Sequence, residues 1–138
     1  MGAVKALKAL GEVPLERRTP QMQVTIENGA EYLLNHHIYR KSHNLSLIAM
    51  PKWLSLGFPR FYDTDILEVL GILARLGYRD ERMQDALEVV KSKQDDAGRW
   101  EIENDWHGRM LVSFDTLGKP SKWITLKALS LLEMVGLS

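Results

Sequence analysis

Three stretches decide the fold: LEVLGILARLG at Leu67–Gly77, LKALSLLEMVG at Leu126–Gly136 and AVKALKALG at Ala3–Gly11. They align without gaps on their closing glycines, and each spaces its leucines as a helix does. The two longer stretches are apolar nearly all round, and such a helix must be covered on most sides. We therefore expect three equivalent inner helices, with Leu7, Leu73 and Leu132 at one shared position.

Amphipathic stretches follow the first two of these segments. Asn28–His37 reads NGAEYLLNHH and Asp85–Gln94 reads DALEVVKSKQ, so that Leu33 matches Val90. Both carry one apolar stripe and one polar face, which is typical of a helix that covers a core from outside. Repeated units that share a buried face must stack to cover it.

The sequence predicts an all-α fold, an α/α helical-repeat array of about five main helices and two long loops. Residues 1–138 are expected to form a single domain of two helix-pair repeats plus a final unpaired helix. The predicted helices cover residues 3–10, 19–37, 64–76, 80–94 and 121–135, and the loops cover 39–62 and 95–119. Weak alternation over Arg109–Phe114 allows a short hairpin in the second loop.

Composition excludes several classes of protein. Eighteen Lys and Arg balance eighteen Asp and Glu, so a nucleic-acid binder that works by bulk positive charge is excluded. The chain has no cysteine, which excludes disulfides, thiolate catalysis and cysteine-bound metals. No apolar run approaches the roughly 20 residues of a membrane span. A cytoplasmic protein without a membrane span is the expectation.

A motif stands at Gln94–Trp100, which reads QDDAGRW. It resembles the repeated Gln–Trp motif of squalene and hopene cyclases. With the repeats included, the chain resembles part of the α/α toroid of terpenoid cyclases and protein prenyltransferase β subunits. In such a motif Gln94 caps the preceding helix, Gly98 permits a tight turn and Trp100 packs back as an apolar plug. The motif therefore bears on structure rather than on chemistry.

Asp63 and Asp65 open the predicted third inner helix. They resemble part of the Asp-x-Asp-Asp motif with which hopene-type cyclases protonate their substrate, although Ile66 stands at the last position. General-acid work requires a protonated carboxyl group beside a second carboxylate. The alternative is that these residues cap the helix and interact with its dipole.

Histidines cluster at His36, His37 and His43. A metal site needs three or four convergent ligands, and adjacent helix residues point about 100° apart. Prenyltransferase β subunits hold zinc with Asp, Cys and His, and this chain has no Cys. We expect no metal and no cofactor.

Aromatic side chains crowd the first loop and the start of the last helix. Those that are candidates for lining an apolar ligand pocket are Trp53, Phe58, Phe61, Tyr62 and Trp123. The alternative is that they cap one end of the core. A second group is a candidate anion or diphosphate site at a helix N-terminus, or else a solvated loop: Trp106, His107, Arg109, Lys119 and Lys122.

These observations favour a non-catalytic module that binds an apolar ligand or a protein partner on its inner-helix side. The ligand implied by the resemblance is an isoprenoid-like small molecule, and a homo-oligomer is the expected assembly, since half a toroid leaves inner surface open. The alternative is an isoprenoid-processing enzyme, or a fragment of one, that uses Asp63 and Asp65 as acid residues.

Overall fold

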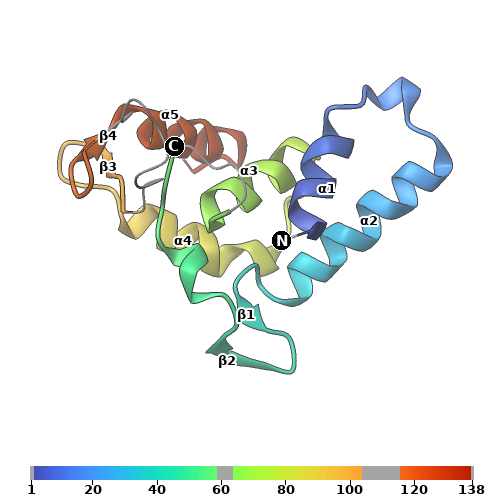
Figure 1. The fold of residues 1–138 in the computed structure, drawn as a ribbon, viewed down its shortest axis with the longest axis horizontal. Coiled ribbons are helices and arrows are strands. Elements are labelled where there is room, and N and C mark those ends of the chain that lie inside the picture. Colours follow the sequence, from blue (N-terminus) through green and yellow to red (C-terminus); the bar gives the residue numbers. More distant parts are fainter. Residues whose placement is uncertain (1, 59–63, 104–115, 138) are drawn as a thin grey trace.

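The computed structural model describes residues 2–58, 64–103 and 116–137. Five α-helices lie in this part of the chain, close to the ranges that the apolar spacing predicts (Figure 1). Their bounds are α1 Gly2–Gly11, α2 Pro20–Asn35, α3 Ile66–Arg75, α4 Gln84–Ser92 and α5 Lys122–Met134.

The prediction of an all-α fold is wrong, because the described chain also contains two small antiparallel sheets. Strand β1 (Arg40–Lys41) pairs with β2 (Asn44–Ile48), and β3 (Trp100–Glu101) pairs with β4 (Pro120–Ser121). Strands β1, β2 and β3 lie in the two connections predicted as loops, residues 39–62 and 95–119, and β4 overlaps the predicted start of the last helix at Ser121. The fold is therefore mixed, with helices and strands.

These strands escape prediction for two physical reasons. All five residues of β2 are exposed, so the strand has no buried face to impose an alternating pattern. The pairing of Trp100 with Ser121 joins the segment that follows α4 to the segment that precedes α5, so it depends on tertiary packing that local spacing does not record. The hairpin expected at Arg109–Phe114 lies outside the described residues.

Side-chain caps set the starts of three helices. The hydroxyl of Thr19 accepts a hydrogen bond from the Met22 amide, and that of Ser121 accepts one from the Ile124 amide. The Asp65 carboxylate accepts one from the Glu68 amide at 2.8 Å. By contrast, a 3₁₀ turn at Glu81–Met83 precedes α4, so the helix expected from Asp80 onward is not continuous.

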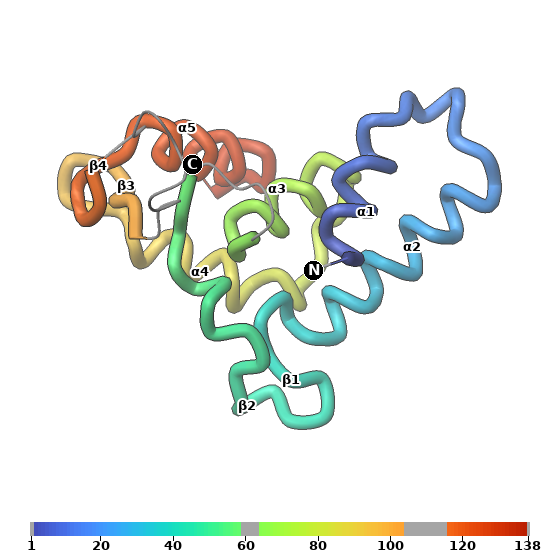
Figure 2. Tube along the Cα trace, in the orientation of Figure 1, coloured from blue at the N-terminus to red at the C-terminus, as the bar shows by residue number. Residues whose placement is uncertain are grey.

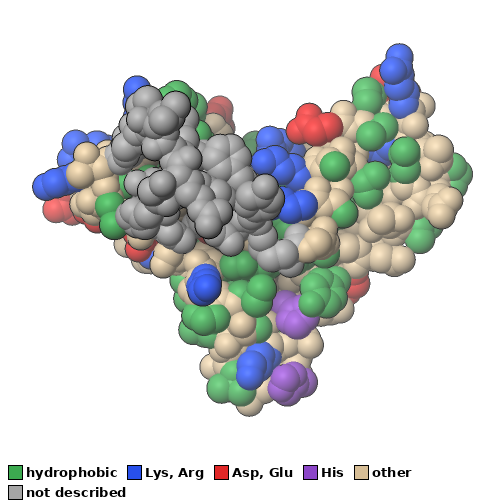
Figure 3. Space-filling view, in the orientation of Figure 1, with side chains coloured by type: hydrophobic (Ala, Val, Ile, Leu, Met, Phe, Trp, Pro, Cys, Tyr) green, Lys and Arg blue, Asp and Glu red, His purple; other side chains and the backbone are tan. Residues whose placement is uncertain are grey.

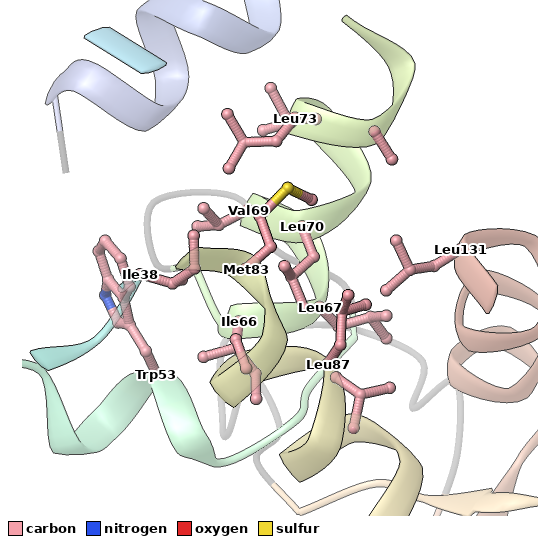
Figure 4. Close-up of a cluster of buried hydrophobic side chains, with 14 of the residues drawn as sticks. Ile38, Trp53, Ile66, Leu67, Val69, Leu70, Leu73, Met83, Leu87 and Leu131 are labelled. Carbon is pink, nitrogen blue, oxygen red and sulfur yellow. The ribbon is translucent and has the colours of Figure 1, made fainter. Parts of the chain in front are cut away.

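Helix α3 lies at the centre of the molecule (Figures 1 and 2). It contacts α1 on one side, α5 on the other, and α4, while α2 covers α1 from outside. Leu7, Leu73 and Leu132 are all buried. In the core, Leu131 of α5 points toward Leu67 and Leu70 of α3 (Figure 4). None of the described helices is long and apolar enough to cross a membrane.

Candidate functional site

Two aromatic rings meet at the head of α5. The rings of Phe58 and Trp123 stack with centroids 5.4 Å apart and an interplanar angle of 11°. Both residues are only partly buried. The pair therefore places two apolar rings together near the N-terminal end of α5.

A lysine ammonium lies over each of these rings. Lys122 Nζ is 5.1 Å from the Trp123 ring centroid, and Lys127 Nζ is 5.1 Å from that of Phe58. Both distances are within the range of cation–π attraction. The site thus combines apolar rings with two positive charges from one helix.

Burial lowers the pKa of Lys127 below the ordinary lysine value, although part of the residue remains exposed. The carboxylates of Asp65 and Glu68 oppose this shift, whereas the charges of Lys8 and Arg75 add to it. Lys127 of α5 therefore feels charged groups from both α1 and α3.

Lys127 lies among charges of both signs, and the carboxylates of Asp65 and Glu68 act on it more strongly than Lys8 and Arg75 do. Within residues 2–58, 64–103 and 116–137, no carboxylate lies within ion-pair distance of Lys8, Arg75 or Lys127. Lys and Arg side chains gather in the notch beside α1 (Figure 3). Like charges that lack acidic partners attract anions.

Glu68 is the buried acidic group of the site. Its side chain is 4% exposed, and its Oε1 accepts a hydrogen bond from Lys5 Nζ at 2.7 Å. Its Oε2 is buried without a hydrogen-bond partner. A buried carboxylate oxygen in this state costs free energy and can accept one further donor.

Of the two aspartates predicted as acid residues, Asp65 lies within the described residues. Asp65 is 2% exposed; its Oδ1 accepts from the Glu68 amide and its Oδ2 accepts from the Gly57 amide at 3.0 Å. Asp65 is therefore the N-cap of α3 and also holds the backbone of the preceding loop at Gly57. Asp63 lies outside the described residues.

The predicted aromatic ligand residues do not all come together. Phe58 and Trp123 stack, whereas Trp53 is a core residue that borders a small cavity lined by α1 and α2. Phe61, Tyr62, Trp106, His107 and Arg109 lie outside the described residues. Lys119 is exposed at the turn before β4.

The Gln94–Trp100 segment forms a tight turn against the end of α4. Gly98 has a φ of +79°, which only glycine adopts without strain. Trp100 is fully buried, and its Nε1–H donates to the Val90 carbonyl at 2.7 Å. The indole, rather than the Gln94 side chain, therefore satisfies this carbonyl near the helix end.

The histidines serve local structure. His36 Nδ1 lies 2.8 Å from the Arg40 carbonyl oxygen, and His37 Nδ1 lies 3.3 Å from Asp85 Oδ2. Across the part of the chain that the structure describes, no three His, Asp or Glu side chains converge as a metal site requires.

Sequence analysis missed Lys127 and Glu68 as members of the site. A usable signal exists, because the two occupy the same position when Leu67–Gly77 is aligned with Leu126–Gly136. A charged residue within an otherwise apolar helix is a reason to look for a partner or a ligand.

No protein-family model, no curated protein and no solved structure matches the chain.

Proposed function

We propose that this protein binds a small amphiphile, an apolar molecule that carries an anionic group. The observation that carries the proposal is the stacked Phe58–Trp123 pair with a lysine ammonium over each ring. The rings offer apolar surface, and Lys127 offers positive charge at its edge. Lys8 and Arg75 are further positive charges that act on Lys127, and the carboxylates of Asp65 and Glu68 offset them.

Two further considerations support a ligand with an apolar body and a protein that binds this ligand rather than converting it. The resemblance of Gln94–Trp100 to the motif of squalene and hopene cyclases favours an isoprenoid-like body. The engagement of both Asp65 oxygens with backbone amides favours a structural carboxylate. The protein then acts as a binding module on the side where α1, α3 and α5 meet.

Calorimetric titration with four probes tests this function: dodecyl phosphate, dodecanol, inorganic phosphate and dodecylamine, with each amphiphile below its micelle concentration. We expect dodecyl phosphate to bind at least tenfold more tightly than either half alone, a difference of about 1.4 kcal/mol. Equal affinity for dodecanol and dodecyl phosphate contradicts a role for the lysines. Tighter binding of dodecylamine, which is a cation, contradicts a site that attracts anions and indicates binding at Glu68 Oε2 instead.

A matched pair of variants localises the binding. Lys127→Met keeps most of the side-chain volume and removes the charge, so it should weaken dodecyl phosphate binding about tenfold. Lys91→Met makes the same change on an exposed residue of α4 and should leave the affinity unaltered. Equal affinities for both variants contradict the assignment.

A further inference from the structure

The alignment of the inner helices shows which surfaces meet inside the chain. In α5, Ala128 and Leu131 are buried, and Leu131 points toward Leu67 and Leu70 of α3 (Figure 4). At the α3–α5 interface, Leu67 and Leu70 form the face of α3 that packs on the next inner helix, which we call the outgoing face. Ala128 and Leu131 form the face of α5 that packs on the preceding inner helix, which we call the incoming face.

The outgoing face of α5 has no such neighbour among the described residues. Leu126 and Leu129 align with Leu67 and Leu70. They are 61% and 44% exposed, whereas Leu67 and Leu70 are 4% and 0% exposed. The same leucine pattern that is buried within the chain is therefore open to solvent on α5.

The incoming face of α1 is also open, and it forms a groove. Ala3, Ala6 and Leu10 align with Ala128, Leu131 and Val135. Together with Thr25 and Asn28 of α2 they line a groove of about 340 Å³. Small side chains at positions 3 and 6 leave room that two leucines can fill.

We infer that this groove takes α5 of a second copy of the chain, with Leu126 and Leu129 seated on Ala3 and Ala6. A copy carries both the leucine face and the groove, and the contact continues the α3–α5 packing by one further helix. The two surfaces differ, so the association is head-to-tail and produces chains or rings rather than a symmetric pair.

The size of the contact sets its strength. Helix α5 has 13 residues and is about 20 Å long, so a strip about 10 Å wide along it covers roughly 200 Å². A stable interface needs about 800 Å² per partner. We therefore expect weak association, with a dissociation constant on the order of 100 μM.

Sedimentation equilibrium over a concentration series tests the inference. The average mass of the wild-type chain should rise beyond that of a dimer as concentration increases. Leu126→Glu with Leu129→Glu removes the leucine face, and Ala6→Glu blocks the groove, so each variant alone should remain monomeric. Mixing the two should restore a one-to-one pair that grows no further, because one intact contact remains.

A matched control places the same charges on another exposed surface. Leu45→Glu with Leu47→Glu alters two exposed leucines of β2 and should associate like the wild type. Circular dichroism checks the helix content, and where the helix content of a glutamate variant falls, glutamine replaces glutamate at the same positions. The inference is overturned if the wild type is monomeric, if the mixture stays monomeric or if the β2 variant loses association. So does mass growth that requires an added lipid or another protein.

Discussion

Lys5 Nζ lies 2.7 Å from Glu68 Oε1, and this ion pair joins α1 to α3 across 63 positions of sequence. The carboxylate is buried while the lysine remains partly exposed. The pair is therefore a packing contact as well as an electrostatic one. The positive charge of Lys5 offsets part of the negative charge of Glu68.

Replacing Lys5 with Met should destabilise the protein by about 3 kcal/mol, because Glu68 is then a buried charge without its partner. The double change Lys5→Met with Glu68→Leu should recover most of that loss, since two apolar side chains can pack in place of the pair. Urea unfolding measures the free energies. A double variant no more stable than Lys5→Met contradicts this account.

Trp100→Phe should destabilise the protein by about 2 kcal/mol, because it shrinks a fully buried side chain and removes the Nε1–H donor, which leaves the Val90 carbonyl with only the Lys93 amide. Trp123→Phe removes an indole from a partly exposed position and should cost less than 1 kcal/mol, roughly the scale of one aromatic contact. Thermal unfolding of both variants gives the comparison. Equal losses contradict the role of the Trp100 hydrogen bond.

Asp65→Asn should destabilise the protein by about 1–2 kcal/mol, because an amide can accept from only one of the two backbone donors. Asp96→Asn, at an exposed position, is the control and should change stability little. The helix content should persist in both. Unchanged stability of Asp65→Asn contradicts the assignment of Asp65 as the cap of α3.

Arg82 makes part of the stability depend on pH. It donates to Asp80 and to Glu31 of α2, and these hydrogen bonds lower the pKa of both carboxyl groups. The stability that they contribute is present above their ordinary pKa values of 3.8 and 4.5. It is lost as the pH falls through the lowered values.

We therefore expect the melting temperature to fall less steeply between neutral and strongly acid pH in Arg82→Met than in the wild type. The variant should also be less stable at neutral pH, and added salt should narrow the difference because the groups are largely exposed. If the melting temperatures of Arg82→Met and the wild type fall in parallel across the acid range, this origin of the pH dependence is contradicted.

Binding at the Phe58–Trp123 site should depend on alkaline pH through Lys127. Its pKa is lowered, so the ammonium loses its proton at a lower pH than an ordinary lysine. Affinity for dodecyl phosphate should thus weaken as the pH rises through that value, and Lys127→Met should lack this dependence. Titration calorimetry at several pH values measures it, and an identical pH profile in the variant contradicts it.

The sequence by itself determined that the five helices exist and where α2, α3 and α5 begin. Apolar residues at helical spacing mark α3 and α5, and Thr19, Asp65 and Ser121 each accept a hydrogen bond from an amide three residues ahead. Such signals are local, so neighbouring residues suffice to read them. The equivalence of the three inner segments was likewise visible in their leucines and closing glycines.

Tertiary structure alone decided the strands and the members of the site. The pairing of Trp100 with Ser121, the stacking of Phe58 on Trp123 and the Lys5–Glu68 ion pair each join distant segments. Which of these segments meet depends on how the helices pack around α3, and no local spacing records that packing. For the same reason, only the folded chain shows that Leu67 is covered while the matching Leu126 is open.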